Sequence, residues 1–437
     1  MLLTVLIAAA ACIAMLVLVF FFPSVSIRRH FISTYWFAPL VGGVLLWLLG
    51  RISGGEILEG LTQSGGINPI QLLVLFLSMT LLSVFLDQAG FFSWLASKVL
   101  RRAGSSQKKL FISLYLMVSV LTVFTSNDVV ILTFTPFLCF FSKGAKIDPL
   151  PFLVAEFVAA NTWSMGLLIG NPTNICLCTA GNVEFLAYLR VMWFPTLLAG
   201  TVSFFVLRLM FRKSLQKPME PCEEEARLSD VPAVVVAILH LAVCIVLLVF
   251  SNFLAMPMWL ITLVCFISLY VSMTLYLLAR KKGLRMITDS FRRAPWEIVP
   301  FVLSMFVVVL ALEKAGATEA LAALLSKGES ILTFGVSSFF AANLVNNIPM
   351  SVFYSAVVEA VPSSQTAGAL YAAVAGSNLG AYLTPIGALA GILWMSLLSR
   401  YGVKMSFGKF IRYCAPVSLC SMAAALLGLW LVIYGGT

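Results

Sequence analysis

Charged residues are scarce in this chain, and histidine is nearly absent. Only 11% of the 437 residues are Asp, Glu, Lys or Arg and two are histidine, whereas 61% are hydrophobic. Ordinary globular proteins carry about 25% charged residues. This composition excludes a soluble globular protein and predicts a chain that lies mostly within a membrane.

Enzyme motifs are also missing from the sequence. It has no glycine-rich phosphate loop, no zinc-protease helix motif and no paired-aspartate signature of an intramembrane protease. The nine cysteines show neither metal-ligand spacing nor a secreted disulfide framework, so we expect buried free thiols. We therefore expect no enzyme activity, no cofactor and no metal site. A membrane enzyme or a scaffold for partner proteins is the alternative.

Long apolar runs are what the chain does have. Runs of about twenty residues, enough to cross a hydrocarbon layer of ~30 Å at about 1.5 Å per residue, recur from Leu2 to Ile433. The net charge of +10 comes mainly from Lys and Arg in the short loops between these runs, which indicates membrane orientation and not nucleic-acid binding. We expect the first run, Leu2 to Phe22, to be a retained helix and not a signal peptide.

An internal repeat divides the chain into two halves. Three landmarks recur in the same order at nearly constant spacing, which indicates duplication. The pairs are Ala89-Gly90 with Ala315-Gly316 (226 residues apart), Ser126-Asn127 with Asn346-Asn347 (220 apart) and Asn161 with Asn378 (217 apart).

Basic loops indicate that the two halves are inverted relative to each other. The helix that ends near Gly90 is followed by a basic loop, whereas its copy is preceded by one. The basic residues are Lys98, Arg101, Arg102, Lys108 and Lys109 in the first half, and Arg280, Lys281, Lys282, Arg285, Arg292 and Arg293 in the second. Basic loops stay in the cytoplasm, and inverted repeats are typical of secondary transporters. The predicted fold is an all-α polytopic membrane protein with an inverted-topology repeat of two halves.

We expect about ten transmembrane helices, two re-entrant hairpins and two broken helices. Each hairpin has a polar tip, and each broken helix has Gly and Pro at membrane depth, which is tolerated only where protein or a cavity satisfies the backbone. The predicted units are 1–66 (N-terminal helices), 67–211 (repeat 1, with hairpin 110–142 and broken helix 150–180), 212–230 (a cytoplasmic linker), 231–292 (connecting helices) and 293–437 (repeat 2, with hairpin 331–361 and broken helix 367–398). Both termini are expected outside.

Polar side chains gather at the tips and breaks. Broken helices offer amide groups and carbonyls to a small polar solute or ion, although such residues can also simply hold helices together. The candidate binding residues are Ser126, Asn127, Asp128, Asn161, Asn171, Thr173, Asn174, Asn346, Asn347, Ser377, Asn378 and Thr384. The helix-break residues are Gly170, Pro172, Gly380, Pro385 and Gly387.

Two acids are candidates for proton coupling. Asp128 follows the first hairpin tip, where an ionisable group is costly and by default functional, and its alternative role is a helix N-cap. Glu156 lies inside the first broken span and is the second candidate, with ordinary packing as its alternative.

At these motifs the chain resembles the arsenite/antimonite efflux permease family (ArsB-type) within the ion transporter superfamily, which also holds sodium/proton antiporters (NhaD-like) and dicarboxylate carriers. The matching segments are "SNDVVILTFTP" (126–136), "ANTWSMGLLIGNPTNI" (160–175), "RAPWEIVPF" (293–301), "NNIPMSVF" (346–353) and "GSNLGAYLTPIGALAGILW" (376–394). Two positions depart from the family pattern. Asn161 stands where many members have Asp, and Ala381-Tyr382 stands where they have Pro-Lys.

The resemblance implies a secondary active transporter, multi-pass in the plasma or inner membrane, that exports arsenite or antimonite by alternating access. Proton exchange drives it, or a soluble ATPase partner assists it. The alternative is a sodium/proton antiporter, or a sodium- or proton-coupled anion (dicarboxylate) transporter on the same scaffold. Expected partners are a small inorganic oxyanion or oxyacid, protons or Na⁺ and the lipid bilayer, with an ATPase subunit and a homodimer as further options.

Overall fold

The computed structural model describes residues 1–22, 24–27, 30–62, 68–181, 183–220, 228 and 230–435. This part of the chain is helical except for one short antiparallel hairpin, β1 (Ser24–Ile27) with β2 (His30–Ser33). Among the described residues, eight helices are long and apolar enough to cross a membrane. The prediction of an all-α polytopic membrane protein is confirmed, whereas the apolar pattern did not predict the small β-hairpin.

The helices fall into two series with the same order. The first series is α1 (Leu2–Phe21), α2 (Phe37–Leu48), α3 (Gly54–Thr62), α4 (Pro69–Gln88), α5 (Phe91–Ala103), α6 (Gln107–Phe124), α7 (Asn127–Gly144), α8 (Leu150–Trp163), α9 (Pro172–Ala180) and α10 (Phe185–Met210). The second is α11 (Val231–Val249), α12 (Met258–Ala279), α13 (Arg285–Arg293), α14 (Ile298–Lys314), α15 (Ala317–Leu325), α16 (Ser330–Val345), α17 (Asn347–Glu359), α18 (Ser363–Gly380), α19 (Leu389–Arg400) and α20 (Phe407–Tyr434).

Each element of one series has a counterpart in the other. The hairpin α6–α7 corresponds to α16–α17, and the broken helix α8/α9 corresponds to α18/α19. The outer helices α1–α3 precede α4 as α11–α13 precede α14, so the duplicated order extends to nearly the whole chain. The inverted-repeat fold with hairpins and broken helices is therefore present as predicted.

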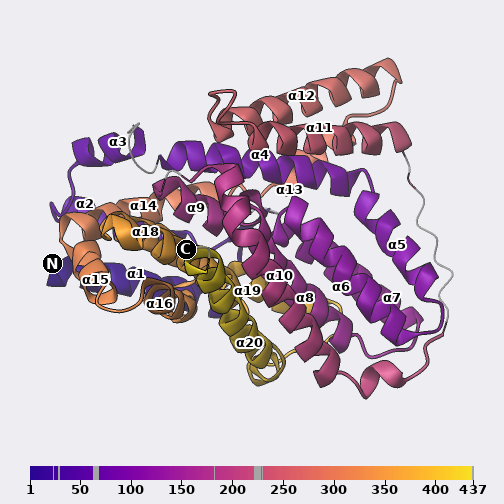
Figure 1. Ribbon diagram of the computed structural model, residues 1–437. Coiled ribbons are helices and arrows are strands. Elements are labelled where there is room, and N and C mark those ends of the chain that lie inside the picture. The colour runs from indigo at the N-terminus through magenta and orange to yellow at the C-terminus, as the bar shows by residue number, and fades with distance from the viewer. Residues whose placement is uncertain are drawn as a thin grey trace.

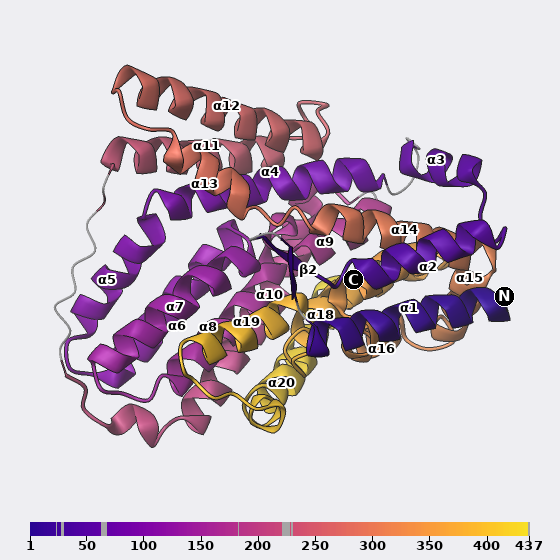
Figure 2. The same ribbon diagram turned by 180° about the vertical axis from the view of Figure 1, so that it is seen from behind.

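The two series exchange their outer helices. The pair α11–α12 packs along α4, whereas α1 and α2 pack against α14. In both views α11 and α12 form an outer layer beside α4, and α5–α8 lie on the opposite side of the molecule from α1, α2 and α14–α16 (Figures 1 and 2). Because α7 also packs on α19 and α17 on α9, one large apolar core runs through both halves. Neither half buries its apolar surface alone.

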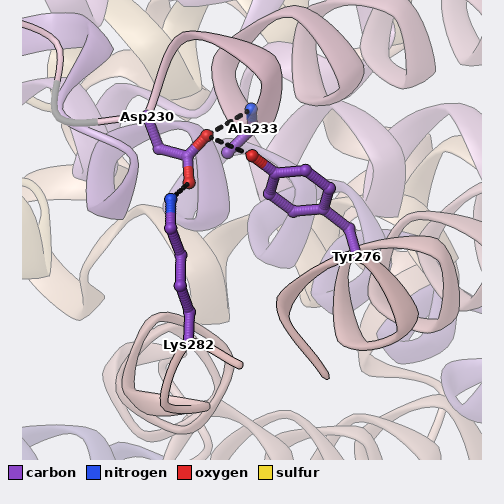
Figure 3. A network of polar contacts seen from close by, with 4 residues as sticks. All are labelled: Asp230, Ala233, Tyr276 and Lys282. Carbon is purple, nitrogen blue, oxygen red and sulfur yellow. Dashed lines mark hydrogen bonds and ion pairs between the residues drawn. The ribbon is translucent and has the colours of Figure 1, made fainter. Parts of the chain in front are cut away.

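A polar cluster fixes one end of the α11–α12 pair. Asp230 caps α11 and accepts hydrogen bonds from the backbone N–H of Ala233 (3.3 Å), the hydroxyl of Tyr276 (3.0 Å) and Nζ of Lys282 (2.6 Å) (Figure 3). Burial alone would raise the pKa of Asp230, but these hydrogen bonds outweigh it and lower the pKa below its usual value. Asp230 is the last residue of the predicted linker 212–230, of which residues 221–227 and 229 lie outside the described part.

Candidate functional site

Four helices begin at one small central cavity. Its volume is about 120 Å³. The helices α7 and α17 start there from the two hairpin tips, and α9 and α19 start there from the two breaks. The lining includes Asn127, Asp128, Asn171, Pro172, Asn347, Ile348, Ala388 and Leu389. The positive ends of the helix dipoles therefore surround the cavity and favour oxygen atoms or an anion inside it.

Asn378 connects the two broken helices beside this cavity. Its Oδ1 accepts hydrogen bonds from Oγ of Ser164 (2.8 Å) and Nδ2 of Asn171 (2.9 Å). Its Nδ2 donates to Oδ1 of Asn174 (2.6 Å) and to the carbonyl of Val374 (2.8 Å). The side chain is fully buried, and its donors and acceptor all have partners. Residues that the sequence placed in different halves thus meet in one neutral network.

The first hairpin tip leaves polar atoms without partners. Nδ2 of Asn127 donates to Oδ1 of Asn161 (3.3 Å), and Nδ2 of Asn161 donates to the carbonyl of Phe157 (2.8 Å). The buried atoms Oγ of Ser126, Oδ1 of Asn127 and Oγ1 of Thr173 have no hydrogen-bond partner in the structure. Unpaired buried polar atoms are costly, and here they lie beside helix starts that line the cavity. A bound solute, ion or water would satisfy them.

The breaks themselves are held by amide side chains. Nδ2 of Asn174 donates to the carbonyls of Ser164 (2.8 Å) and Leu167 (3.1 Å) in the first break. In the second, Oδ1 of Asn343 accepts from the backbone N–H (3.1 Å) and hydroxyl (2.7 Å) of Thr384, and its Nδ2 donates to the carbonyl of Gly380 (3.0 Å). Asn343 was not among the predicted residues, although an Asn near the end of an apolar helix was a signal. Asn174, Asn343 and Thr384 therefore replace the hydrogen bonds that the helix loses.

The second tip is tied to the second break. Asn346 has a φ of +75°, which an L side chain rarely adopts. Its Nδ2 donates to the carbonyl of Ile386 (3.1 Å), and the N–H of Asn347 donates to the carbonyl of Gly387 (2.9 Å). Pro385 and Gly387 lie in this break between α18 and α19. The contacts hold the start of α17 against the cavity.

Asp128 stands between two cavities. It lines the central cavity and also a larger one of about 500 Å³ that contains Ser126, Asp87 and Arg293. We call the larger one the vestibule. At its mouth, Nη1 of Arg293 lies 3.3 Å from Oδ2 of Asp87, and the Arg293 side chain is 62% exposed. Gln88, with its amide oxygen turned towards Arg293, accepts from Nε (2.8 Å) and Nη1 (2.6 Å). The vestibule thus leads from a basic surface to Asp128.

Two further residues of the central cavity were missed at the sequence level. Glu297, just before α14, lines the cavity, and its Oε1 accepts a hydrogen bond from the N–H of Ser33 (2.8 Å). Tyr35 lines it too and packs edge-on against Phe301. Glu297 lies within the matched segment "RAPWEIVPF", which was the available signal. The cavity therefore holds two carboxyl groups, one from each half.

Glu156 lies apart from the central cavity. It is fully buried in α8. Both of its carboxylate oxygens lie within hydrogen-bonding distance of the Thr135 hydroxyl on α7 (3.0 and 3.1 Å). Ser377 is also set back from the cavity and pairs with Ser351 (3.1 Å). These two residues are thus separate from the cavity lining.

One of the two departures from the family pattern contacts the residue next to the other. The hydroxyl of Tyr382 hydrogen-bonds that of Thr162 (2.8 Å), the residue directly after Asn161. The resemblance implies an acid at 161 and a base at 382 for other members of the family. This chain has neutral side chains at both positions, so the net charge of the region stays the same.

Comparisons with known proteins agree with this architecture. A family model described as a citrate transporter (CitMHS) matches residues 5–376. The arsenical pump membrane protein of Escherichia coli is 30% identical over 381 residues, which cover 81% of this chain and 85% of that protein.

Two solved structures share the fold. The Alcanivorax borkumensis YdaH transporter, reported to have an unusual topology, superposes with a TM-score of 0.56 at 15% identity and covers 98% of both chains. Neisseria gonorrhoeae MtrF, from a class of antimetabolite efflux pumps, gives a TM-score of 0.52 at 13% identity, covering 98% of this chain and 94% of its own. This chain belongs to the citrate-transporter family of membrane transporters, together with the arsenical pump membrane proteins that it matches along most of its length.

Proposed function

We propose that this chain exports a small oxyacid or oxyanion, such as arsenite or antimonite, in exchange for protons by alternating access. The observation that carries the proposal is the meeting of four helix starts and two carboxyl groups, Asp128 and Glu297, at one cavity between the halves. The helix ends suit substrate oxygen atoms, and ionisable groups at membrane depth suit protons. The arsenical pump relatives make arsenite the first substrate to test.

The size of the cavity supports a small inorganic substrate. A volume of about 120 Å³ corresponds to roughly four water molecules at about 30 Å³ each. A small oxyacid fits such a space, whereas the larger citrate would need the site to open. An organic-anion transporter is the second candidate, because the vestibule is about 500 Å³ and has Arg293 at its mouth.

The position of Asp128 suggests how coupling works. The basic residues around Arg293 favour a vestibule that faces the cytoplasm, so in this proposal substrate enters and protons leave past Asp128. Rocking of one half against the other would then open the cavity to the outside. One charge crossing 100 mV is worth about 2.3 kcal/mol, which supports roughly 50-fold accumulation at about 1.4 kcal/mol per factor of ten. We propose Glu156 as a second proton-carrying group, remote from the substrate.

Arsenite accumulation in everted membrane vesicles with an acidic interior tests the proposal. We expect the wild type to accumulate arsenite and a protonophore to abolish this. Asp128→Asn should lower accumulation at least tenfold, because it removes the proton-carrying group. The control is Glu59→Gln, an exposed acid on α3, which should transport like the wild type. Glu156→Gln should be stably folded and change the pH dependence of the rate.

Two results would contradict the proposal. Accumulation that follows a sodium gradient and ignores protonophores would favour a sodium-coupled transporter. A folded wild type that moves citrate or another carboxylate but no arsenite would favour the organic-anion transporter.

A further inference from the structure

Three side chains that contain sulfur lie where α4 packs against the α11–α12 pair. None of them lines the central cavity. Sγ of Cys244 on α11 lies 3.6 Å from Sδ of Met79 on α4. The thiol of Cys265 on α12 interacts with that of Cys244 where α11 and α12 pack together. All three side chains are buried. We call this group the sulfur cluster.

The distance between Sγ of Cys244 and Sδ of Met79 matches that of two ligands of a single metal ion. Two sulfurs bound at about 2.3 Å and at a tetrahedral angle lie about 3.8 Å apart, close to the 3.6 Å between Cys244 and Met79. Among the described residues no three His, Cys, Asp or Glu side chains could hold a metal ion together. A site here therefore needs the Met79 thioether as its third ligand. Thiolate and thioether ligands together select soft ions such as Cu(I).

A cavity lies beside the helices that carry the sulfur cluster. It has a volume of about 470 Å³ and is lined by Leu75 of α4, Ser251 after α11 and Met258 of α12. Met79 follows Leu75 by four residues, and Cys265 follows Met258 by seven, so each sulfur lies on the helix face that lines the cavity. At about 1.5 Å per residue, these two sulfur-bearing residues lie roughly 6 to 10 Å further along their helices than the lining residues.

The wall of the same cavity carries more sulfur. Cys178, Met256 and Met258 all line it, and Met256 is 37% exposed at the surface. A soft ion entering the cavity would therefore pass sulfur ligands before it reaches the cluster. Ordinary core packing explains each buried sulfur separately, but it gives no reason for sulfur atoms both in the cluster and along the wall of the neighbouring cavity.

We propose that Cys244, Cys265 and Met79 form a binding site for one soft metal ion of the Cu(I) class, reached through this cavity. Binding deprotonates the thiols and joins α4 of the first half to α11 and α12 of the second. A bound ion thereby restrains these two parts against each other. The proposal is independent of the proposed transport function, since it uses no residue of the central cavity.

The test is Ag(I) binding to the reduced, purified full chain in detergent, measured by metal analysis and by the shift in unfolding temperature. We expect the Cys244→Ser, Cys265→Ser double variant to bind one ion fewer than the wild type. Met79→Leu conserves volume and should bind that ion at least tenfold more weakly. The control Cys414→Ser changes a buried cysteine on α20 and should leave this ion in place.

If the double variant does not fold, the metal-site proposal is tested by comparing Met79→Leu with the wild type. The wild type should unfold at a higher temperature with one equivalent of Ag(I), and Met79→Leu should lose most of that increase. Equal binding by the wild type, Met79→Leu and the double variant would overturn the proposal. So would a wild type that binds no Ag(I) beyond its exposed sulfur groups.

Discussion

At the scale of single residues, the two halves are connected at the broken helices by neutral amide side chains. Asn378 of the second half binds Ser164, Asn171 and Asn174 of the first through its amide group. Burying an amide whose hydrogen bonds are all made costs far less than burying an ion. Such a network can therefore hold helix breaks at membrane depth and leave Asp128 and Glu297 as the charges of the cavity.

Asn378→Ala should destabilise the protein and stop transport. The substitution leaves the buried amides of Asn171 and Asn174 without their partner, and each unpaired group costs about 1–3 kcal/mol. We expect a clearly lower unfolding temperature in detergent and a loss of arsenite accumulation. Asn252→Ala, at an exposed amide, is the matched control and should change neither. Similar unfolding temperatures for the two variants would show that the network contributes little.

At the scale of secondary-structure elements, each broken helix requires a glycine whose backbone lies very close to a carbonyl group earlier in the chain. A Cβ atom on Gly170 would lie 2.3 Å from the carbonyl oxygen of Ser164, and one on Gly387 would lie 2.4 Å from that of Gly380. No side chain fits at such distances. The glycines are therefore required because the chain turns back on itself just before α9 and α19 begin.

Gly170→Ala and Gly387→Ala should each shift a helix start away from the central cavity. Overpacking of this kind costs about 1–3 kcal/mol, so we expect lower thermal stability and a larger loss of transport. Gly408→Ala is the control, because a Cβ there meets nothing within 4 Å, and it should behave like the wild type. Wild-type transport by Gly170→Ala would mean that the first break tolerates a shift.

At the scale of the whole molecule, the exchange of outer helices creates two ion pairs between corresponding helices of the two series. The acidic and basic partners are interchanged between the two pairs. Arg293 of α13 pairs with Asp87 of α4 (3.3 Å), and Glu56 of α3 pairs with Lys314 of α14 (2.6 Å). The elements correspond, since α3 and α4 are the counterparts of α13 and α14, but the charges are reversed. Exposed pairs contribute little to stability. Arg293 therefore matters here as an exposed cation at the mouth of the vestibule.

Arg293→Gln should distinguish a neutral substrate from an anion. Arsenite is uncharged at neutral pH, so we expect its initial rate to change by less than about twofold, because rim charges act mainly on the approach of charged ligands. For an organic anion, the initial rate of Arg293→Gln should instead be several-fold lower than that of the wild type. This difference in rate should shrink at high ionic strength, because salt screens the charge of Arg293. Initial rates at low and high ionic strength provide the measurement. A large, salt-dependent loss for arsenite would contradict a neutral substrate.

Much of the candidate site was predictable from the sequence because its signals are local. Asn127, Asn171, Asn346 and Pro385 stand out as polar or helix-breaking residues within apolar runs, and the structure has tips or breaks at each of them. Glu297 and Asn343 were missed because their roles come from partners distant in the chain, such as Ser33 for Glu297. Glu156 was a local signal too, yet it packs against Thr135 away from the cavity.

The sequence alone determined the membrane class, the two matching series of helices and the positions of the breaks, because these follow from composition and from backbone preferences within a few residues. Only the tertiary structure decided the exchange of outer helices, the size of the cavity and the partner of each amide. Asn174 and Asn378, for example, are 204 residues apart and joined by a 2.6 Å hydrogen bond. Such a contact depends on how helices from both halves pack, and no local pattern contains that information.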